Sequence, residues 1–193
     1  MVETEYKFAV PSATDTIAVL EKAGYACVKE RTHELSVMYD NPQGVMQHTD
    51  GRIRVRQSGE TVEFCYKKPM TREGVKQEIE HEVRVDALEP LQQILSAMEF
   101  TPTTSYERYR TEYRRNGVKA TVDQYPFATF LELEGDLDAI KQASAELGFS
   151  ESQNLTDSCD TLFIRWRAER QLPYVPHMTF DGYDIADKQK AAG

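Results

Sequence analysis

The sequence lacks the features of membrane proteins, secreted proteins and disulfide-bonded proteins. No apolar run approaches the ~18 residues that a membrane-spanning helix needs, and the N-terminus enters a patterned, charged segment instead of the apolar region of a signal peptide. The 3 cysteines, Cys27, Cys65 and Cys159, are odd in number and lack metal-ligand spacing, so no disulfide framework is expected. We therefore expect a protein of the reducing cytoplasm that does not associate with membranes.

The sequence also lacks a surplus of positive charge and an internal linker. Lys and Arg number 23 against 32 Asp and Glu, which gives a net charge of −9 and a pI of about 5.0. Nucleic-acid-binding surfaces are basic, so no nucleic-acid partner is expected. No Pro/Gly/Ser-rich or low-complexity segment divides the 193 residues, which are enough for a domain with a core. We predict one domain over residues 1–168 and a C-terminal extension over residues 169–193.

What the sequence does contain is a series of alternating apolar and polar runs, which is typical of half-buried strands. These runs cover residues 2–8, 27–39, 52–57, 61–67, 75–85, 106–115, 117–123 and 129–134. Helical periodicity predicts helices over residues 13–23, 88–98, 137–147 and 156–167. Gly59 and the Asn116-Gly117 pair predict hairpin turns, so the order is mainly antiparallel strands with inserted helices, an α+β arrangement.

The polar face of these strands is almost entirely charged. Arg52, Arg54 and Arg56 alternate with Ile53 and Val55. The acids gather on same-face positions as Glu3/Glu5, Glu78/Glu80/Glu82 and Glu132/Glu134, with Asp123 nearby in the pattern. A solvated polar face is the commonest meaning of such alternation, but that face usually carries Thr, Ser and Gln.

Clustered acids suggest a bound cation. Like charges on neighbouring same-face positions repel, and a cation removes that repulsion. Clusters of oxygen ligands alone suit hard ions such as Mg²⁺ or Mn²⁺. If the sheet closes, the charged faces line a tunnel in which carboxylates hold metal and Arg and Lys side chains hold phosphate oxygens.

A series of short motifs runs in order along the chain from residue 1 to about residue 165. They are Glu3-Thr-Glu-Tyr-Lys7, Tyr39-Asp-Asn-Pro42, Ile53-Arg-Val-Arg56, Tyr66-Lys-Lys-Pro69, Glu78-Ile-Glu80, Tyr106-Glu-Arg-Tyr-Arg110 and the segment from Asp123 to Gly135. In type, order and spacing the series resembles the CYTH family, the triphosphate tunnel metalloenzymes, whose first motif is ExExK. The sequence departs from the family pattern at Lys68, Ala128, Arg108 and Cys159, where the family commonly has Gly, Gly, Lys and Tyr.

The resemblance implies a closed eight-stranded antiparallel β tunnel with helices packed outside, and it implies roles for the charged residues. Glu3, Glu5, Glu132 and Glu134 would hold one divalent ion, Mg²⁺ or Mn²⁺, and Asp123 with Glu78 or Glu80 would support a second. Lys7, Lys67 and Arg110 would be catalytic, and Arg52, Arg54, Arg56 and Arg108 would bind the triphosphate. The extension over residues 169–193 is then either disordered or a cover for a tunnel mouth.

The resemblance leaves several functions open. The leading hypothesis is hydrolysis of a small-molecule triphosphate, either inorganic triphosphate or thiamine triphosphate. A class IV adenylyl cyclase, which converts ATP to cyclic AMP and pyrophosphate, is the alternative within the same fold. The chain has no Gly-rich nucleotide-binding loop that would indicate adenine recognition. A non-catalytic polyphosphate or nucleotide-binding module is disfavoured because both the acidic and the basic sets are intact, and a homodimer is left open by analogy.

Overall fold

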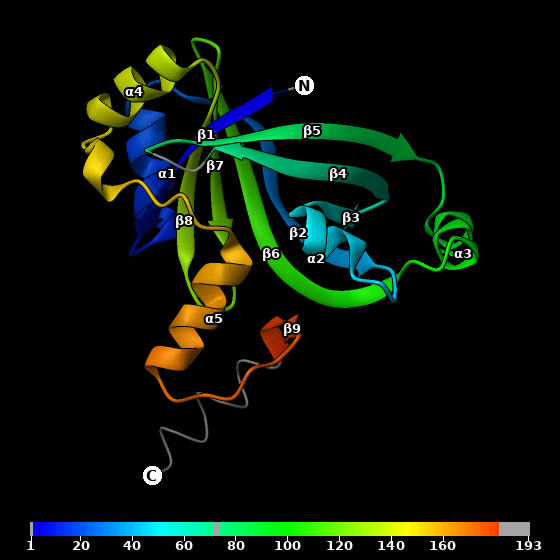
Figure 1. The fold of residues 1–193 in the computed structure, drawn as a ribbon. Coiled ribbons are helices and arrows are strands. Elements are labelled where there is room, and N and C mark those ends of the chain that lie inside the picture. The colour runs from blue at the N-terminus through cyan, green and yellow to red at the C-terminus, as the bar shows by residue number, and fades with distance from the viewer. Residues whose placement is uncertain (1, 72–73, 182–193) are drawn as a thin grey trace.

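The sheet closes on itself in the computed structural model, which describes residues 2–71 and 74–181 (Figure 1). Its strands are β1 (Val2–Val10), β2 (Ala26–Asp40), β3 (Arg52–Ser58), β4 (Thr61–Thr71), β5 (Lys76–Val85), β6 (Thr101–Arg115), β7 (Val118–Gln124), β8 (Thr129–Glu134) and β9 (His177–Met178). The order is β2-β3-β4-β5-β1-β8-β7-β6, and a long antiparallel β2–β6 pairing joins the two ends. This closure confirms the predicted eight-stranded antiparallel tunnel of an α+β protein.

The helices lie outside the tunnel. They are α1 (Ala13–Lys22), α2 (Val45–Thr49), α3 (Leu88–Ala97), α4 (Leu137–Glu146) and α5 (Cys159–Glu169). Helices α1 and α4 cover the outer faces of β7 and β8, and α3 packs at the far side of the sheet, next to β3 and β4 (Figure 1). Among the residues that the structure describes, no helix is long and apolar enough to cross a membrane.

The core lies between these helices and the outer strand faces, because the alternating apolar residues point outward. Tyr6 and Phe8 of β1 and Leu133 of β8 pack with Leu20 of α1 and Ile140 of α4. Burial of one such side chain contributes roughly 1.5–3 kcal/mol. The tunnel interior is thereby left to the opposite, charged faces.

Helix α2 was not predicted, and one carboxylate explains why it forms. Asp40 accepts hydrogen bonds from the backbone N–H groups of Met46 and Gln47 at 2.9 and 3.2 Å, and the Asn41 side chain accepts one from Val45 at 3.1 Å. These contacts satisfy the free N–H groups of the first turn. A five-residue helix of this kind leaves no helical periodicity in the sequence.

The C-terminal extension contacts the tunnel strands as far as the structure describes it. Strand β9 pairs in parallel with β6, where Met178 lies opposite Tyr106. Met178 is buried with Tyr106 and Phe163 of α5. Residues 182–193 lie outside the described residues, so the two interpretations of that part of the extension stay as predictions.

Candidate active site

A cavity of about 1190 Å³ runs inside the closed sheet. Side chains from all eight tunnel strands and from the N-terminus of α5 line it. The predicted site residues that line the cavity are Glu3, Glu5, Lys7, Arg52, Arg54, Arg56, Lys67, Glu78, Glu80, Arg108, Arg110, Glu132 and Glu134. Acidic and basic side chains line it in nearly equal numbers, although the whole chain carries a net charge of −9.

The strand order places the predicted glutamates and the predicted arginines on opposite sides of the cavity. The acidic wall comprises Glu78 and Glu80 of β5, Glu3 and Glu5 of β1, and Glu132 and Glu134 of β8, three strands that are neighbours in the order β5-β1-β8. The basic wall comprises Arg52, Arg54 and Arg56 of β3 and Arg108 and Arg110 of β6, which flank β2. In a closed sheet of eight strands, β1 and β2 are four strands apart in either direction, so the two walls face each other.

The register brings the carboxylates of the acidic wall together. Glu3 lies opposite Glu78 on one side of β1, and Glu5 lies opposite Glu134 on the other. Burial is the main cause of the raised pKa of the Glu134 carboxyl. The charge of Lys119 lowers this pKa, and the charge of Glu3 raises it. Carboxylates crowded in this way lose repulsion when a cation binds.

Lysines are inserted into the acidic wall. The Lys7 ammonium lies 3.4 Å from Glu5 and 3.3 Å from Glu132, and Lys76 lies 3.0 Å from Glu5. Lys67 lies 2.6 Å from Glu3. Burial lowers the pKa of Lys7, but the two carboxylates outweigh it and raise the pKa above its usual value. Lys7 therefore stays protonated near neutral pH and acts as a fixed positive charge.

The donor set of the acidic wall fits a hard divalent ion. Its members offer carboxylate oxygens only, the ligand type that Mg²⁺ and Mn²⁺ prefer. Glu5 and Glu132 both line the cavity, and an oxygen of each lies within 3.4 Å of the same Lys7 ammonium, so these two carboxylates converge.

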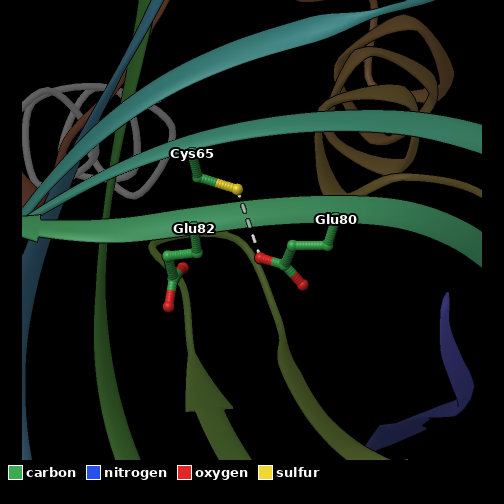
Figure 2. Close-up of side chains that lie close together, drawn as sticks. All are labelled: Cys65, Glu80 and Glu82. Atoms are coloured by element: carbon green, nitrogen blue, oxygen red, sulfur yellow. Dashed lines mark hydrogen bonds between the residues drawn. The ribbon is translucent and has the colours of Figure 1, made fainter. Parts of the chain in front are cut away.

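A further group at the edge of this wall contains a thiol. Cys65, Glu80 and Glu82 have ligand atoms that lie within 4.8 Å of one another, and Figure 2 shows the three side chains converging from β4 and β5. The Cys65 thiol donates a hydrogen bond to Glu80 at 3.2 Å, and burial raises the pKa of Cys65 to about 12. Since a neutral thiol is a weak metal ligand, only the two carboxylates of this group suit a cation.

Two buried acids hold the basic wall in place. Asp123 is 0% exposed and accepts hydrogen bonds from Arg110 Nε at 2.6 Å and from Arg108 Nη1 at 3.0 Å. Glu34 of β2 accepts from Arg108 Nε and Nη2 at 2.9 and 2.7 Å and from Lys29 at 2.8 Å. Asp123 is the one predicted site residue that does not line the cavity, because both of its oxygens face these guanidinium groups.

Glu34 was missed by the sequence reasoning. It shares its strand face with Thr32, Ser36 and Met38, so this face of β2 does not show the purely charged alternation of the other strands. The spacing did place Glu34 on the same face as Ser36, but only the β2–β6 register puts it opposite Arg108. Other lining residues outside the predicted set include Lys29, Lys76, Tyr106, Tyr125, Ser158, Cys159 and Asp160.

The basic wall has donor capacity left over. Arg54 is 9% exposed, and its Nε has no hydrogen-bond partner among the residues that the structure describes. Burial and the charges of Arg108 and Arg54 lower the pKa of Arg56. Buried donors are rarely left without a partner, and repelling arginines are stabilised by an anion between them. The wall is therefore suited to a ligand with several anionic oxygens.

Comparison with known proteins points to one family. The CYTH domain model matches residues 1–155. The protein named "Putative adenylate cyclase MJ0240" of Methanocaldococcus jannaschii is 24% identical over 143 residues, which are 74% of this chain and 81% of the relative.

Solved structures share the fold. A structure described as that of a putative adenylate cyclase from Vibrio parahaemolyticus has a TM-score of 0.74 at 16% identity and covers 85% of this chain and 98% of its own. A protein from Hippeastrum, described as a putative adenylyl cyclase with a dominant triphosphatase activity, has a TM-score of 0.61 at 15% identity and covers 91% of this chain and 97% of its own. The family model covers well over half of the sequence, and the chain therefore belongs to the CYTH domain family.

Proposed function

We propose that this chain is a divalent-metal-dependent hydrolase of inorganic triphosphate. The family is generally divalent-metal-dependent, and its relatives are named as adenylyl cyclases or triphosphatases. The observation that supports the proposal best is the pair of facing walls, one of carboxylates and one of arginines, within the cavity of a closed sheet. In a complex of triphosphate with a divalent ion, the ion would suit the acidic wall and the phosphate oxygens would suit the basic wall.

The basic wall would bind and orient the phosphate chain. Arg54 offers an unpartnered Nε–H, and Arg56 and Arg108 lie beside it. Glu34 and Asp123 hold the Arg108 side chain from two sides, so its geometry is set before the ligand arrives. Pre-set donors stabilise developing charge without reorganisation during the reaction.

The acidic wall would hold the ion at the opposite side of the phosphate chain. Glu5 and Glu132 would be ligands of a divalent ion, which would supply positive charge to the phosphate oxygens and a water of lowered pKa. Lys7, held between the same two carboxylates, keeps its proton and stabilises the negative charge that shifts to the leaving phosphate. Lys7 is thus assigned a charge-stabilising role and is not a general base.

The lining favours inorganic triphosphate over substrates with a ring. Within residues 2–71 and 74–181, no Phe or Trp lines the cavity, and the tyrosines that do, Tyr106 and Tyr125, are both buried. Stacking against a base or a thiazole ring needs an accessible aromatic face. Adenylyl cyclase activity remains the second candidate because a relative that matches most of this chain carries that name.

Product analysis tests the proposal directly. The purified full chain is incubated with Mg²⁺ or Mn²⁺ and with inorganic triphosphate, thiamine triphosphate or ATP, and the products are separated by chromatography. Release of orthophosphate from inorganic triphosphate supports the proposal. Cyclic AMP and pyrophosphate from ATP alone would establish the cyclase instead, and tight binding without turnover would indicate a binding module.

Metal and triphosphate should each stabilise the fold. A ligand that binds only the folded chain adds about 2.7 kcal/mol at a hundredfold excess over its dissociation constant. We expect the melting temperature to rise from EDTA to Mg²⁺ and to rise again when triphosphate is added with Mg²⁺. Thermal-shift titrations at neutral pH measure both increments, and an unchanged melting temperature in all conditions would contradict the assignment of both walls.

Arg54→Ala should weaken binding of triphosphate. The variant removes one charge-assisted contact, which is worth on the order of 1.5–3 kcal/mol, so the dissociation constant should rise by roughly tenfold or more. Calorimetric titration of triphosphate into each protein measures this change. Arg165→Ala, which removes an exposed arginine of α5 paired with Asp157, is the matched control and should bind as the parent does. Equal weakening in both variants would mean that only net charge matters.

A further inference from the structure

Tyr106 lies inside the tunnel but has no place in the scheme above. It stands on β6 on the same strand face as Arg108 and Arg110, it lines the cavity, and it is 8% exposed. Its register partners, Ser36 on β2 and Met178 on β9, are both uncharged. Its ring centroid lies 5.9 Å from that of Tyr125, whose hydroxyl accepts a hydrogen bond from Arg108 at 3.2 Å.

Arginines of two strands line the same cavity as Tyr106. Arg108 belongs to the same strand face, and Arg54 and Arg56 belong to β3, on the other side of β2. Ser36 of β2 lies opposite both Tyr106 and Arg56 in the register, and Arg56 Nε donates to its hydroxyl at 3.4 Å. The titratable and charged groups that act electrostatically on Tyr106 are Arg54 and Arg56 of β3, Arg108 of β6, Tyr125 after β7 and Asp160 of α5.

This surrounding charge acts on the phenol. Burial raises the pKa of Tyr106, but the three arginines outweigh burial and lower the pKa to about 8, with Asp160 acting weakly in the opposite direction. One of these arginines, Arg54, has an Nε without a hydrogen-bond partner among the described residues. An anion bound there would neutralise them, and the phenol would then hold its proton more tightly.

We propose that Tyr106 is a further substrate-binding residue of the tunnel, whose neutral phenol donates a hydrogen bond to the phosphate chain held by Arg54, Arg56 and Arg108. The inference rests on the proposed anion-binding function of the basic wall. A phenolate at this position is an internal anion that competes with phosphate for the same arginines. When triphosphate binds above about pH 8, one proton is therefore taken from solvent onto the phenolate oxygen.

The affinity for triphosphate should depend on pH through the phenol oxygen of Tyr106. Above about pH 8, the affinity of the parent chain for triphosphate should fall with rising pH faster than the affinity of Tyr106→Phe, which has no phenol to deprotonate. The ratio of the two affinities should change by about tenfold for each pH unit. Calorimetric titrations of the full chain with inorganic triphosphate and EDTA, from about pH 6.5 to about pH 9.5, measure this difference. Ionisation of triphosphate itself affects both proteins equally and cancels in the comparison.

Tyr109→Phe is the matched control. Tyr109 lies three positions along β6 on the outer strand face, where its ring packs 5.0 Å from that of Phe180. This variant should show the same pH dependence as the parent chain. A parallel fall in affinity in all three proteins would overturn the role of Tyr106 and leave the tunnel function intact. Failure of the parent chain to bind triphosphate even at pH 7 would overturn both.

A second measurement needs no variant. At about pH 9 the parent chain should show tyrosinate absorbance in the near ultraviolet, and adding triphosphate should lower it as Tyr106 regains its proton. Titrations in buffers of different ionisation enthalpy should report uptake of about one proton per bound triphosphate at that pH. Unchanged absorbance together with no proton uptake, under conditions where triphosphate binds, would contradict the proposal.

Discussion

Glu132→Gln should reduce triphosphate turnover by about 10²–10³-fold, the loss expected when several kcal/mol of charge stabilisation are removed. Glu132 connects the two walls: one of its oxygens lies 3.3 Å from Lys7, and the other accepts a hydrogen bond from Arg110 at 2.7 Å. Despite burial, the charges of Lys7 and Arg110 hold the pKa of Glu132 well below its usual value, so it is an anion at any working pH. Glutamine keeps the shape and removes that charge.

Rates at saturating triphosphate over a range of Mg²⁺ concentrations measure this loss. Glu112→Gln is the matched control, because it removes the same charge from the same cavity, next to Lys29 and away from the acidic wall. We expect the control to retain most of its turnover. Near-parental turnover by Glu132→Gln at limiting Mg²⁺ would show that Glu132 is not a ligand of the ion. Circular dichroism of both variants checks that the fold is unchanged.

Asp123→Asn should have the largest effect on stability, a loss of roughly 3–5 kcal/mol in the free energy of unfolding. The carboxylate is 0% exposed and accepts hydrogen bonds from Arg108 and Arg110, both of which are buried. The amide removes the negative charge and leaves two guanidinium groups facing each other without it. Burial of charge that has lost its partner is among the most costly single changes in a folded protein.

Urea denaturation in EDTA at neutral pH measures this loss. Glu146→Gln, which breaks the exposed pair with Arg115, is the control and should unfold close to the parent chain. Triphosphate should restore part of the lost stability of Asp123→Asn, because its oxygens can replace the missing carboxylate beside the arginines. A change no larger than that of the control would mean that Glu34 and Glu132 already neutralise both guanidinium groups.

The strands and most helices follow from local patterns. Alternation with a period of two identified all eight tunnel strands, and the Asn116-Gly117 turn has the expected positive φ angles of 49° and 78°. The observed ends of strands and helices differ from the predicted ends where a neighbouring strand or a capping side chain fixes them. Strand β6 begins at Thr101, five residues before the predicted start, because β2 continues to pair with it there. The last helix begins at Cys159, because Ser158 caps it by accepting the N–H of Thr161 at 3.3 Å.

By itself, the sequence determined which residues are charged and which strand face each occupies. Successive side chains of a strand point to opposite faces, so the face of each residue follows from its position in the strand alone. The sequence therefore predicted the acidic and basic sets, whereas the closed tunnel that they line was implied by the resemblance to the CYTH family. Only the tertiary structure decided how these charges pair. Glu34 meets Arg108 across 74 positions of sequence, and Glu3 meets Lys67 across 64. Such pairings depend on the register between strands that are distant in the chain, and that register is set by closure of the whole sheet.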